Sequence, residues 1–461
     1  MNYPFWDVPL IGSGWVIGTI AIFHVVISHF AIGGGFYLPI AERKALAEGR
    51  ADWMEILRNH SRFFLILTGV FGAVSGVGIW FSIGLAHPEA TSTLIHNFVF
   101  AWAIEWVFFV VELTAAAVYY YTWGKLDSRT HLKVGWVYAL SSWMSLVIIN
   151  GILTFMLTPG ERWLSVAGSG NEASAFWSAF FNPTYWPSLF LRTLVMISLA
   201  GIFALFTAAA IDGYERPQLK TEIVRWSSRW LVPSFVLMPF FFAWYLFSVP
   251  ESQRQLLQLG ISTIGQGTFT QVTRAALVSV MTSATIVAIV YFVAYKQARS
   301  FSRGWAWTIL LLAVAATAAT EQAREMLRKP YVIGNHMYSN GIRTSEVASF
   351  NEAGYLTNSI WLREDERRSL QDGGSRLAAG ELIFRGQCAS CHTRDGYRSM
   401  RRLLQGRNRQ AIENLLGVLH RSEANSTYRF MPPLVGSKQE IEALADYLEN
   451  MVTEPVRTAG L

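Results

Sequence analysis

Cys388 and Cys391 are the only two cysteines of this 461-residue chain, and both lie in the segment Cys388-Ala-Ser-Cys391-His392. This pattern attaches a c-type haem: the two thiols bond to the porphyrin edge, and the histidine ligates the iron. A zinc half-site or a redox dithiol would use the same two thiols. Zinc normally needs a second pair of ligands, which the sequence lacks, and the adjacent His392 fits a haem better than a dithiol. Because such haems are attached outside the cytoplasm, the motif also predicts which side of a membrane this segment reaches.

A second group of chemically competent residues lies within long apolar runs. Glu105 and Glu112 are seven residues apart, so they share one helix face about two turns from each other. His24 lies in the first apolar run, and Glu321 and Glu325 close the last one. Charged groups in membrane helices are expensive and usually functional, although a lone membrane histidine is often only a packing residue. One histidine with several carboxylates favours iron ligation and a proton path.

The composition indicates a polytopic membrane protein with a soluble appendage. The chain is 52% hydrophobic, 14% aromatic and 15% charged, against roughly 25% charged residues in a soluble domain. We expect an all-α fold, because a lone segment in lipid must satisfy its own backbone hydrogen bonds. Runs of about 20 apolar residues can cross a bilayer. Eight such runs lie near residues 14–40, 63–86, 97–122, 132–157, 188–211, 231–249, 274–295 and 304–323.

The basic residues set the expected topology. They form short clusters after the first, third, fifth and seventh runs, whereas 87–96 has none and 158–187 has only Arg162. Because they do not form one patch, the net charge of +6 does not indicate nucleic-acid binding. The positive-inside rule places the N-terminus outside, and eight crossings return the chain outside. We therefore expect a multi-pass protein of the cell inner membrane whose Cys-x-x-Cys-His motif is periplasmic. No signal-peptide pattern is present at the N-terminus.

Three regions follow from this pattern: a membrane domain over 1–335, a polar linker or arm over 336–375, and a haem domain over 376–461. The tail, over roughly 376–454, resembles a small class I cytochrome c. The resemblance rests on the helix that begins at Leu377, the Cys-x-x-Cys-His motif, and Met431-Pro-Pro-Leu before an amphipathic terminal helix. It implies His392 and Met431 as the axial ligands. Met431 could instead be a core residue, and His420 is the rival sixth ligand.

The membrane part, over roughly 14–335, resembles subunit I of the cytochrome bd oxidases. The segments that carry the resemblance are Phe23-His24, Ala31-Ile-Gly33, Ile40-Ala-Glu42, Ala103-Ile-Glu105 through Glu112, Asn150-Gly151 and Glu325-x-x-Arg328-Lys329-Pro330-Tyr331. The last of these is similar to the family's Glu-x-Gly-Arg-Gln-Pro-Trp signature and is the most specific.

The resemblance implies that His24, Glu105 and Glu325 bind an active-site haem pair, a high-spin haem b with a haem d or a second haem b. It further implies proton delivery by Glu112, although the spacing from Glu105 is one residue shorter than in the family. Arg328 would stabilise haem propionates or oxygen-reduction intermediates. His29 lies on another face of the first run, and its role stays open.

The sequence departs from the family in three places. The run 188–211 contains no histidine, and Arg192 lies near the place where the family's low-spin haem b has its ligand. A short segment over 250–272 replaces the long quinol-binding loop, and a ninth helix is missing. We therefore expect the low-spin haem b and the quinol site to be lost, with a covalent periplasmic haem taking over electron uptake.

These observations predict an oxidoreductase, a bd-like terminal oxidase subunit that passes electrons from haem c to membrane haems for oxygen reduction. The alternative is a haem electron relay of a larger respiratory complex without oxygen chemistry. Nitric oxide as the substrate, and a membrane-anchored cytochrome c whose helices hold no haem, also stay open. We expect a second helical subunit of bd type or a paralogue, and a periplasmic electron donor such as a cytochrome c.

Overall fold

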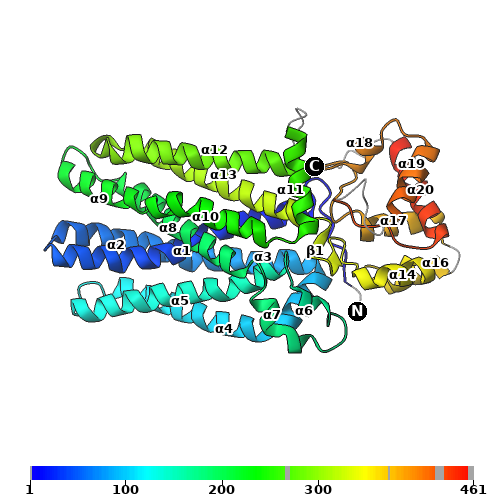
Figure 1. The fold of residues 1–461 in the computed structure, drawn as a ribbon, viewed down its shortest axis with the longest axis horizontal. Helices are drawn as coiled ribbons and strands as arrows, with labels where there is room; N and C mark the ends of the chain where they lie inside the picture. The colour runs from blue at the N-terminus through cyan, green and yellow to red at the C-terminus, as the bar shows by residue number, and fades with distance from the viewer. Residues whose placement is uncertain (1–2, 265–269, 372–373, 421–429, 455–461) are drawn as a thin grey trace. The chain divides into compact units, whose positions relative to one another are not determined.

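The computed structural model describes residues 3–264, 270–371, 374–420 and 430–454 (Figure 1). In that part of the chain, eight helical segments are long and apolar enough to cross a membrane. They span Ser13–Ala47, Ala51–Ala86, Pro88–Tyr121, Ser128–Phe155, Tyr185–Ala208, Pro217–Ser248, Gln271–Tyr295 and Arg303–Arg328. Each covers one of the eight apolar runs, so the expected polytopic all-α bundle is confirmed. The short segment 250–272, which is expected to replace the quinol-binding loop, lies partly outside the described residues.

Three of these segments contain interruptions. The second consists of α2 (Ala51–Ile66), a π-helical turn (Leu67–Gly72) and α3 (Ala73–Ala86). The sixth consists of α9 (Pro217–Arg229) and α10 (Val232–Ser248), and the seventh of α12 (Gln271–Ile289) and a second π-helical turn (Val290–Tyr295). The others are α1 (Ser13–Ala47), α4 (Pro88–Tyr121), α5 (Ser128–Phe155), α8 (Tyr185–Ala208) and α13 (Arg303–Arg328), of which α4 is kinked at Phe98, a residue with non-helical backbone angles.

The chain forms two compact units. One, called here the membrane unit, comprises 21–77 and 95–327; the other, called here the tail unit, comprises 1–20, 78–94 and 328–461. Within the membrane unit the long helices run beside one another (Figure 1). Their core is aromatic: Phe30 stacks on Phe203 with 3.9 Å between ring centroids, and Phe64 meets Phe30 edge-on at 4.6 Å. Such ring pairs contribute beyond the area they bury.

Small residues allow the helices of the membrane unit to approach closely. A Cβ on Gly33 of α1 would overlap the backbone carbonyl of Met196 in α8. Close backbone approach through glycine is typical of helix pairs in membranes. Asn150 of α5 is fully buried, donates to the carbonyl of Tyr185 (2.9 Å) and accepts from Ser188 Oγ (2.7 Å). Asn150 therefore joins α5 to α8.

We expect Gly33→Ala to destabilise the membrane unit, because overpacking of this kind costs about 1–3 kcal/mol. The thermal unfolding midpoint of the purified full chain in detergent measures the effect. Gly69→Ala is the matched control, since an added Cβ there meets nothing within 4 Å. Equal midpoints for the two variants would show that the α1–α8 approach tolerates a methyl group.

The connection 158–187 contains the short helices α6 (Glu161–Leu164) and α7 (Phe176–Phe180). Aromatic residues in such a connection are typical of an interfacial belt, and only some of these are placed for that role. Trp177 is 68% exposed, whereas Trp163 is 1% exposed and donates from Nε1 to Asn97 Oδ1 at 2.9 Å. This connection is therefore partly a packed cap on the membrane unit.

The tail unit has its own core. Helix α17 (Arg376–Gln387) crosses α20 (Lys438–Thr453) so closely that a Cβ on Gly380 would overlap the carbonyl of Ala443. The N-terminus of α20 carries a capping box, in which Ser437 Oγ accepts from the Glu440 amide and the Glu440 carboxylate accepts from the Ser437 amide. Helices α18 (Met400–Leu404) and α19 (Arg409–His420) complete this helical group.

Residues 328–371, which include most of the expected arm, also fold within the tail unit. They contain strands β1 (Tyr331–Ile333) and β2 (Met337–Tyr338), paired antiparallel, and helices α14 (Val347–Ala353), α15 (Tyr355–Asn358) and α16 (Glu364–Gln371). The backbone amides of Tyr355 and Leu356 both donate to the Glu440 carboxylate at 2.8 Å. The carboxylate that caps α20 therefore also fixes this segment.

Candidate functional site

His392 is held by its own loop in the orientation that an axial ligand requires. Helix α17 ends at Gln387, and the turn that follows is closed by the bond from the His392 amide to the Cys388 carbonyl (3.0 Å). The His392 ring donates from Nδ1 to the Arg398 carbonyl at 3.0 Å. A carbonyl oxygen can only accept, so Nδ1 carries the proton and Nε2 keeps its lone pair for a metal.

Both cysteines are free, partly buried thiols. Burial raises the pKa of the Cys388 thiol to about 12. Cys391 Sγ lies 4.0 Å from Lys329 Nζ and 3.9 Å from Ser339 Oγ. Among the residues that the structure describes, no three His, Cys, Asp or Glu side chains gather as a metal-ion site. Within the part of the chain that the structure describes, the two thiols therefore have no zinc ligand set around them.

The loop that follows Met431 is hydrogen-bonded to the residue just before the haem motif. Gln387 donates from Nε2 to the Val435 carbonyl (2.8 Å) and accepts from the Val435 amide at Oε1 (3.0 Å). His420 Nδ1 bonds the Leu434 carbonyl at 3.1 Å, which leaves Nε2 with its lone pair, so this hydrogen bond does not exclude His420 as the rival ligand. Met431 itself is partly exposed at the start of this loop. The sequence offered no signal for Gln387, whose role depends on a residue 48 positions away.

A cavity of about 830 Å³ adjoins the haem motif within the tail unit. Its walls include His392, Ala389 and Ser390, together with Phe384, Tyr447 and residues 4–10. Ligand cavities commonly measure 300–1,000 Å³, so this cavity is of the size of a ligand site. The cysteines and Met431 are not part of its lining, so this cavity is not itself the pocket of a haem that is bonded to both thiols and ligated by Met431.

In the membrane unit, His24 shows the same arrangement as His392. Its Nδ1 lies 3.0 Å from Ser75 Oγ, and that hydroxyl donates to the Phe71 carbonyl at 2.5 Å. The only proton of the Ser75 hydroxyl is donated to the Phe71 carbonyl, so Ser75 Oγ accepts a hydrogen bond from His24 Nδ1–H. His24 Nε2 therefore keeps its lone pair. A second residue that orients a ligating histidine is typical of metal centres. Ser75 is 51 residues away, and the sequence did not single it out.

The carboxylates of the expected site lie on two helices. Glu105 is partly buried and Glu112 is 5% exposed on α4, two turns apart on one face as predicted. Glu325 is partly buried near the end of α13, and Arg328 is its last, buried residue. The described residues do not gather His24, Glu105 and Glu325 around one point, which excludes a bare metal ion shared by all three. A haem iron needs only one or two protein ligands.

Glu321 is engaged in an ion pair and is not a free ligand. Its Oε2 lies 2.7 Å from Arg324 Nη2, and Arg192 of α8 interacts electrostatically with the same carboxylate. Arg192, which lies near the place where the related family has its low-spin haem b ligand, is thus part of a charge cluster. His29 donates from Nδ1 to the Val25 carbonyl in its own helix, at 2.8 Å.

A buried polar triad in the membrane unit was not anticipated. Glu42 accepts from Tyr119 Oη (2.7 Å) and bonds His131 Nδ1 (2.8 Å), while His131 Nε2–H donates to the Tyr119 carbonyl (2.8 Å). All three residues are at most 4% exposed. The triad joins α1, α4 and α5 in a shared network, and because every polar atom has a partner, it fits a structural role.

Comparisons with known proteins agree with the membrane fold. The family model "Cytochrome bd terminal oxidase subunit I" matches residues 13–237, a region that includes His24, Glu105, Glu112 and Arg192. The curated relative "Cytochrome bd-II ubiquinol oxidase subunit 1" of Escherichia coli (strain K12) is 25% identical over 182 residues. That alignment covers 39% of this chain and 34% of the relative, so the chain spans about a third of the relative's length.

A solved structure shares the fold. The bd oxidase from Geobacillus thermodenitrificans superposes with a TM-score of 0.54 at 14% identity, over 70% of this chain and 86% of that one. The family match ends before Glu325 and before the Cys-x-x-Cys-His motif, so it does not cover the haem c site. The membrane part of this chain is therefore similar to subunit I of the cytochrome bd terminal oxidases and has the helical fold of a bd oxidase.

Proposed function

We propose that this chain is a membrane-bound respiratory oxidoreductase, a bd-like terminal oxidase subunit that takes up electrons through a periplasmic haem c. Electrons would then reach membrane haems, where oxygen is reduced. The observation that carries the proposal is that each unit holds a histidine whose Nδ1–H is engaged and whose Nε2 is left for an iron: His392 and His24. When bound, the haems supply one-electron transfer and an open iron for oxygen.

The chain's own residues would divide the remaining tasks. Cys388 and Cys391 hold the porphyrin edge, and His392 and Met431 ligate its iron; a thioether favours Fe(II) and so raises the potential. Four other side chains serve the membrane haems: His24, Glu105 and Glu325 as ligands, and Arg328 as a counter-charge for propionates.

Glu112 is the proposed proton carrier. Reduction of oxygen to water consumes protons, and Glu112 is a buried acid on the same face of α4 as Glu105. Tyr138 of α5 interacts electrostatically with Glu112, so the buried carboxyl has a polar side chain near it. The membrane haems would be a haem b with a haem d or a second haem b.

Chain connectivity supports electron transfer from the tail to the membrane haems. Cys391 Sγ lies 4.0 Å from Lys329 Nζ. Glu325 precedes Lys329 by four residues, and four residues span at most about 14 Å of extended chain. The residue proposed to hold a membrane haem is therefore tied by a short stretch of chain to the residue beside the haem c attachment site.

Partners are part of the proposal. Large apolar side chains are exposed along α4 and α10, for example Phe100 at 77% and Phe240 at 80%. Such surfaces suit lipid or a second helical subunit of bd type. The electron donor would be a periplasmic protein such as a cytochrome c, and the protein would lie in the cell inner membrane with its tail on the periplasmic side.

Oxygen uptake by the purified protein, with any subunits that copurify, tests the function. We expect oxygen consumption when haem c is reduced by ascorbate and a mediator, and a spectral shift when carbon monoxide binds the reduced membrane haem. Uniformly six-coordinate spectra without oxygen uptake would favour the alternative, a haem relay in a larger complex. Nitric oxide consumption without oxygen consumption would identify the other substrate.

A further inference from the structure

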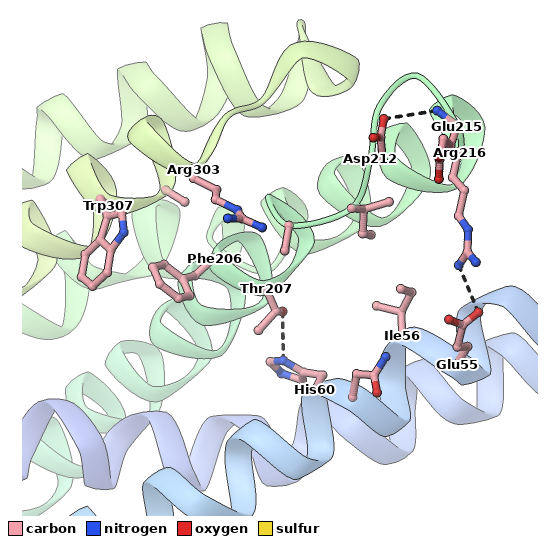
Figure 2. A pocket seen from close by; sticks show the side chains of 14 residues that line it. Glu55, Ile56, His60, Phe206, Thr207, Asp212, Glu215, Arg216, Arg303 and Trp307 are labelled. Carbon is pink, nitrogen blue, oxygen red and sulfur yellow. Dashed lines mark hydrogen bonds and ion pairs between the residues drawn. The ribbon is translucent and has the colours of Figure 1, made fainter.

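A cavity of about 700 Å³ lies in the membrane unit, where α2, the C-terminal end of α8 and the start of α13 form its walls (Figure 2). Glu55 in its lining pairs with Arg216 at 3.0 Å. His60 bonds Thr207 Oγ1 through Nδ1 at 3.0 Å, and its Nε2 is enclosed by the protein rather than open to the cavity. These polar side chains are therefore engaged or closed off, and we assign this cavity no ligand.

The N-terminal residues 3–12, called here the strap, belong to the tail unit and are anchored on it at two places. The first anchor is at the start of the strap. The Tyr3 amide donates to the Ile360 carbonyl at 2.8 Å, and Phe5 meets Trp361 edge-on with 5.9 Å between ring centroids. Most of the strap lines the cavity of about 830 Å³, so it is not closely packed along its whole length. Its position therefore depends on its anchors.

The second anchor of the strap is on the loop that follows the Cys-x-x-Cys-His motif. The Leu10 carbonyl accepts from the Tyr397 amide at 2.7 Å. The two segments approach so closely that a Cβ on Gly396 would overlap the Leu10 carbonyl. Just beyond the strap, the Trp15 ring meets Tyr397 edge-on with 5.6 Å between centroids. This contact therefore depends on glycine at position 396, and it fixes the amide of Tyr397.

The carbonyl of Tyr397 is fixed within the loop itself. Thr393 is buried, and its Oγ1 donates to the Tyr397 carbonyl (2.9 Å) and accepts from the Gly396 amide (2.9 Å). Tyr397 is thus bonded on both sides, by the strap and by Thr393. The peptide unit that joins it to Arg398 is therefore held in one orientation.

Arg398, the next residue along the chain, has a strained backbone. Its φ is 49°, in the left-handed region that a residue with a Cβ adopts only at a cost. Such strain persists where the surrounding structure imposes it, and it gathers at functional sites. The Arg398 carbonyl is also the acceptor of His392 Nδ1–H, at 3.0 Å. The strained residue is thus the one that orients the axial ligand.

We propose that the strap is a positioning element of the haem c site. By holding Tyr397 through Leu10, it keeps the neighbouring residue in its left-handed conformation, and the Arg398 carbonyl then stays on His392. The proposal rests on the proposed function, because it concerns the haem that this histidine would ligate. A hydrogen-bond acceptor on one ring nitrogen makes a ligating imidazole more basic, which favours Fe(III). The strap therefore lowers the reduction potential of haem c.

Gly396→Ala tests the strap, because the added methyl group displaces Leu10. In the full chain with any copurifying subunits, we expect faster amide hydrogen exchange over 393–400 and a higher haem c potential in an optical redox titration. A single hydrogen bond sets the scale, so the shift toward Fe(II) should be about twofold to tenfold, and tenfold is about 59 mV for one electron. Covalent haem staining should be unchanged, since both thiols are kept. Gly84→Ala is the matched control, because its added Cβ meets nothing within 4 Å.

Two variants of Arg398 separate positioning from general loosening of the loop. Arg398→Gly and Arg398→Ala both remove the charge, but only glycine adopts the left-handed conformation without strain. Gly396→Ala should therefore raise the potential less in the Arg398→Gly background than in the Arg398→Ala background. Equal shifts in the two backgrounds would show general loosening and would contradict the proposal.

Phe5→Ala releases the first anchor without touching the loop. It removes the contact with Trp361 and with the Arg385 guanidinium, which lies over the Phe5 ring at 5.5 Å. We expect a rise of the haem c potential in the same direction as in Gly396→Ala, but smaller. A potential that stays unchanged in both variants, or exchange over 393–400 as slow in Gly396→Ala as in the unsubstituted chain, would overturn the proposal. An unsubstituted chain without covalent haem would instead contradict the proposed function.

Discussion

The double variant Cys388→Ser, Cys391→Ser loses its covalent haem and, with it, oxygen uptake from a periplasmic donor. Both thioether bonds depend on these thiols, and no other cysteine exists in the chain. We expect haem staining of the denatured protein on a gel to fall to background. The non-covalent haem extracted by acidic acetone should stay unchanged, because His24, Glu105 and Glu325 are untouched.

The matched control for this variant is Ser390→Ala. Ser390 lies between the two cysteines and lines the adjacent cavity, but it forms no bond to a porphyrin. Its staining and oxygen uptake should match those of the unsubstituted chain. Haem staining that persists in the double cysteine variant would contradict the haem c assignment, and uptake that persists without staining would show that electrons enter by another route.

Redox titrations of two further variants of the full chain distinguish Met431 from His420 as the sixth ligand of haem c. Met431→Ala should lower the reduction potential of haem c, because the thioether that favours Fe(II) is gone. His420→Ala should leave the potential nearly unchanged, because the Met431 thioether is still present. The reverse outcome in a redox titration would assign the iron to His420.

The second large effect is expected at His24. His24→Ala should remove about one non-covalent haem per chain, because a haem iron depends on its protein ligand. Pyridine haemochrome analysis after acid–acetone extraction measures this loss. The covalent haem should be retained, which distinguishes loss of a ligand from general unfolding.

Ser75 and Ser28 supply the controls for His24. Ser75→Ala removes the acceptor of His24 Nδ1–H, and loss of such an orienting partner typically weakens metal binding 10–100-fold. Ser28→Ala removes a hydroxyl that bonds only the Val25 carbonyl in the same helix, so haem content should be unchanged. If His24→Ala retained all of its non-covalent haem, another residue would be the ligand.

The sequence by itself determined the features that depend on neighbouring residues. The eight crossings follow from runs of apolar residues, because lipid imposes its requirement on each segment separately. The Cys-x-x-Cys-His motif is equally local, since five consecutive residues define it. The spacing of Glu105 and Glu112 fixed a common face because the helix repeat is constant. Even the capped start of α20 at Ser437 has a local pattern.

Only the tertiary structure revealed the partners that orient these residues. Ser75 meets His24 across 51 residues, Gln387 holds Val435 across 48, Glu42 bonds His131 across 89, and Thr207 meets His60 across 147. None of these pairs has a spacing rule, because packing of separate helices brings them together. A histidine in an apolar run can be found from sequence, whereas the nitrogen left free for a ligand depends on which distant group holds the other one.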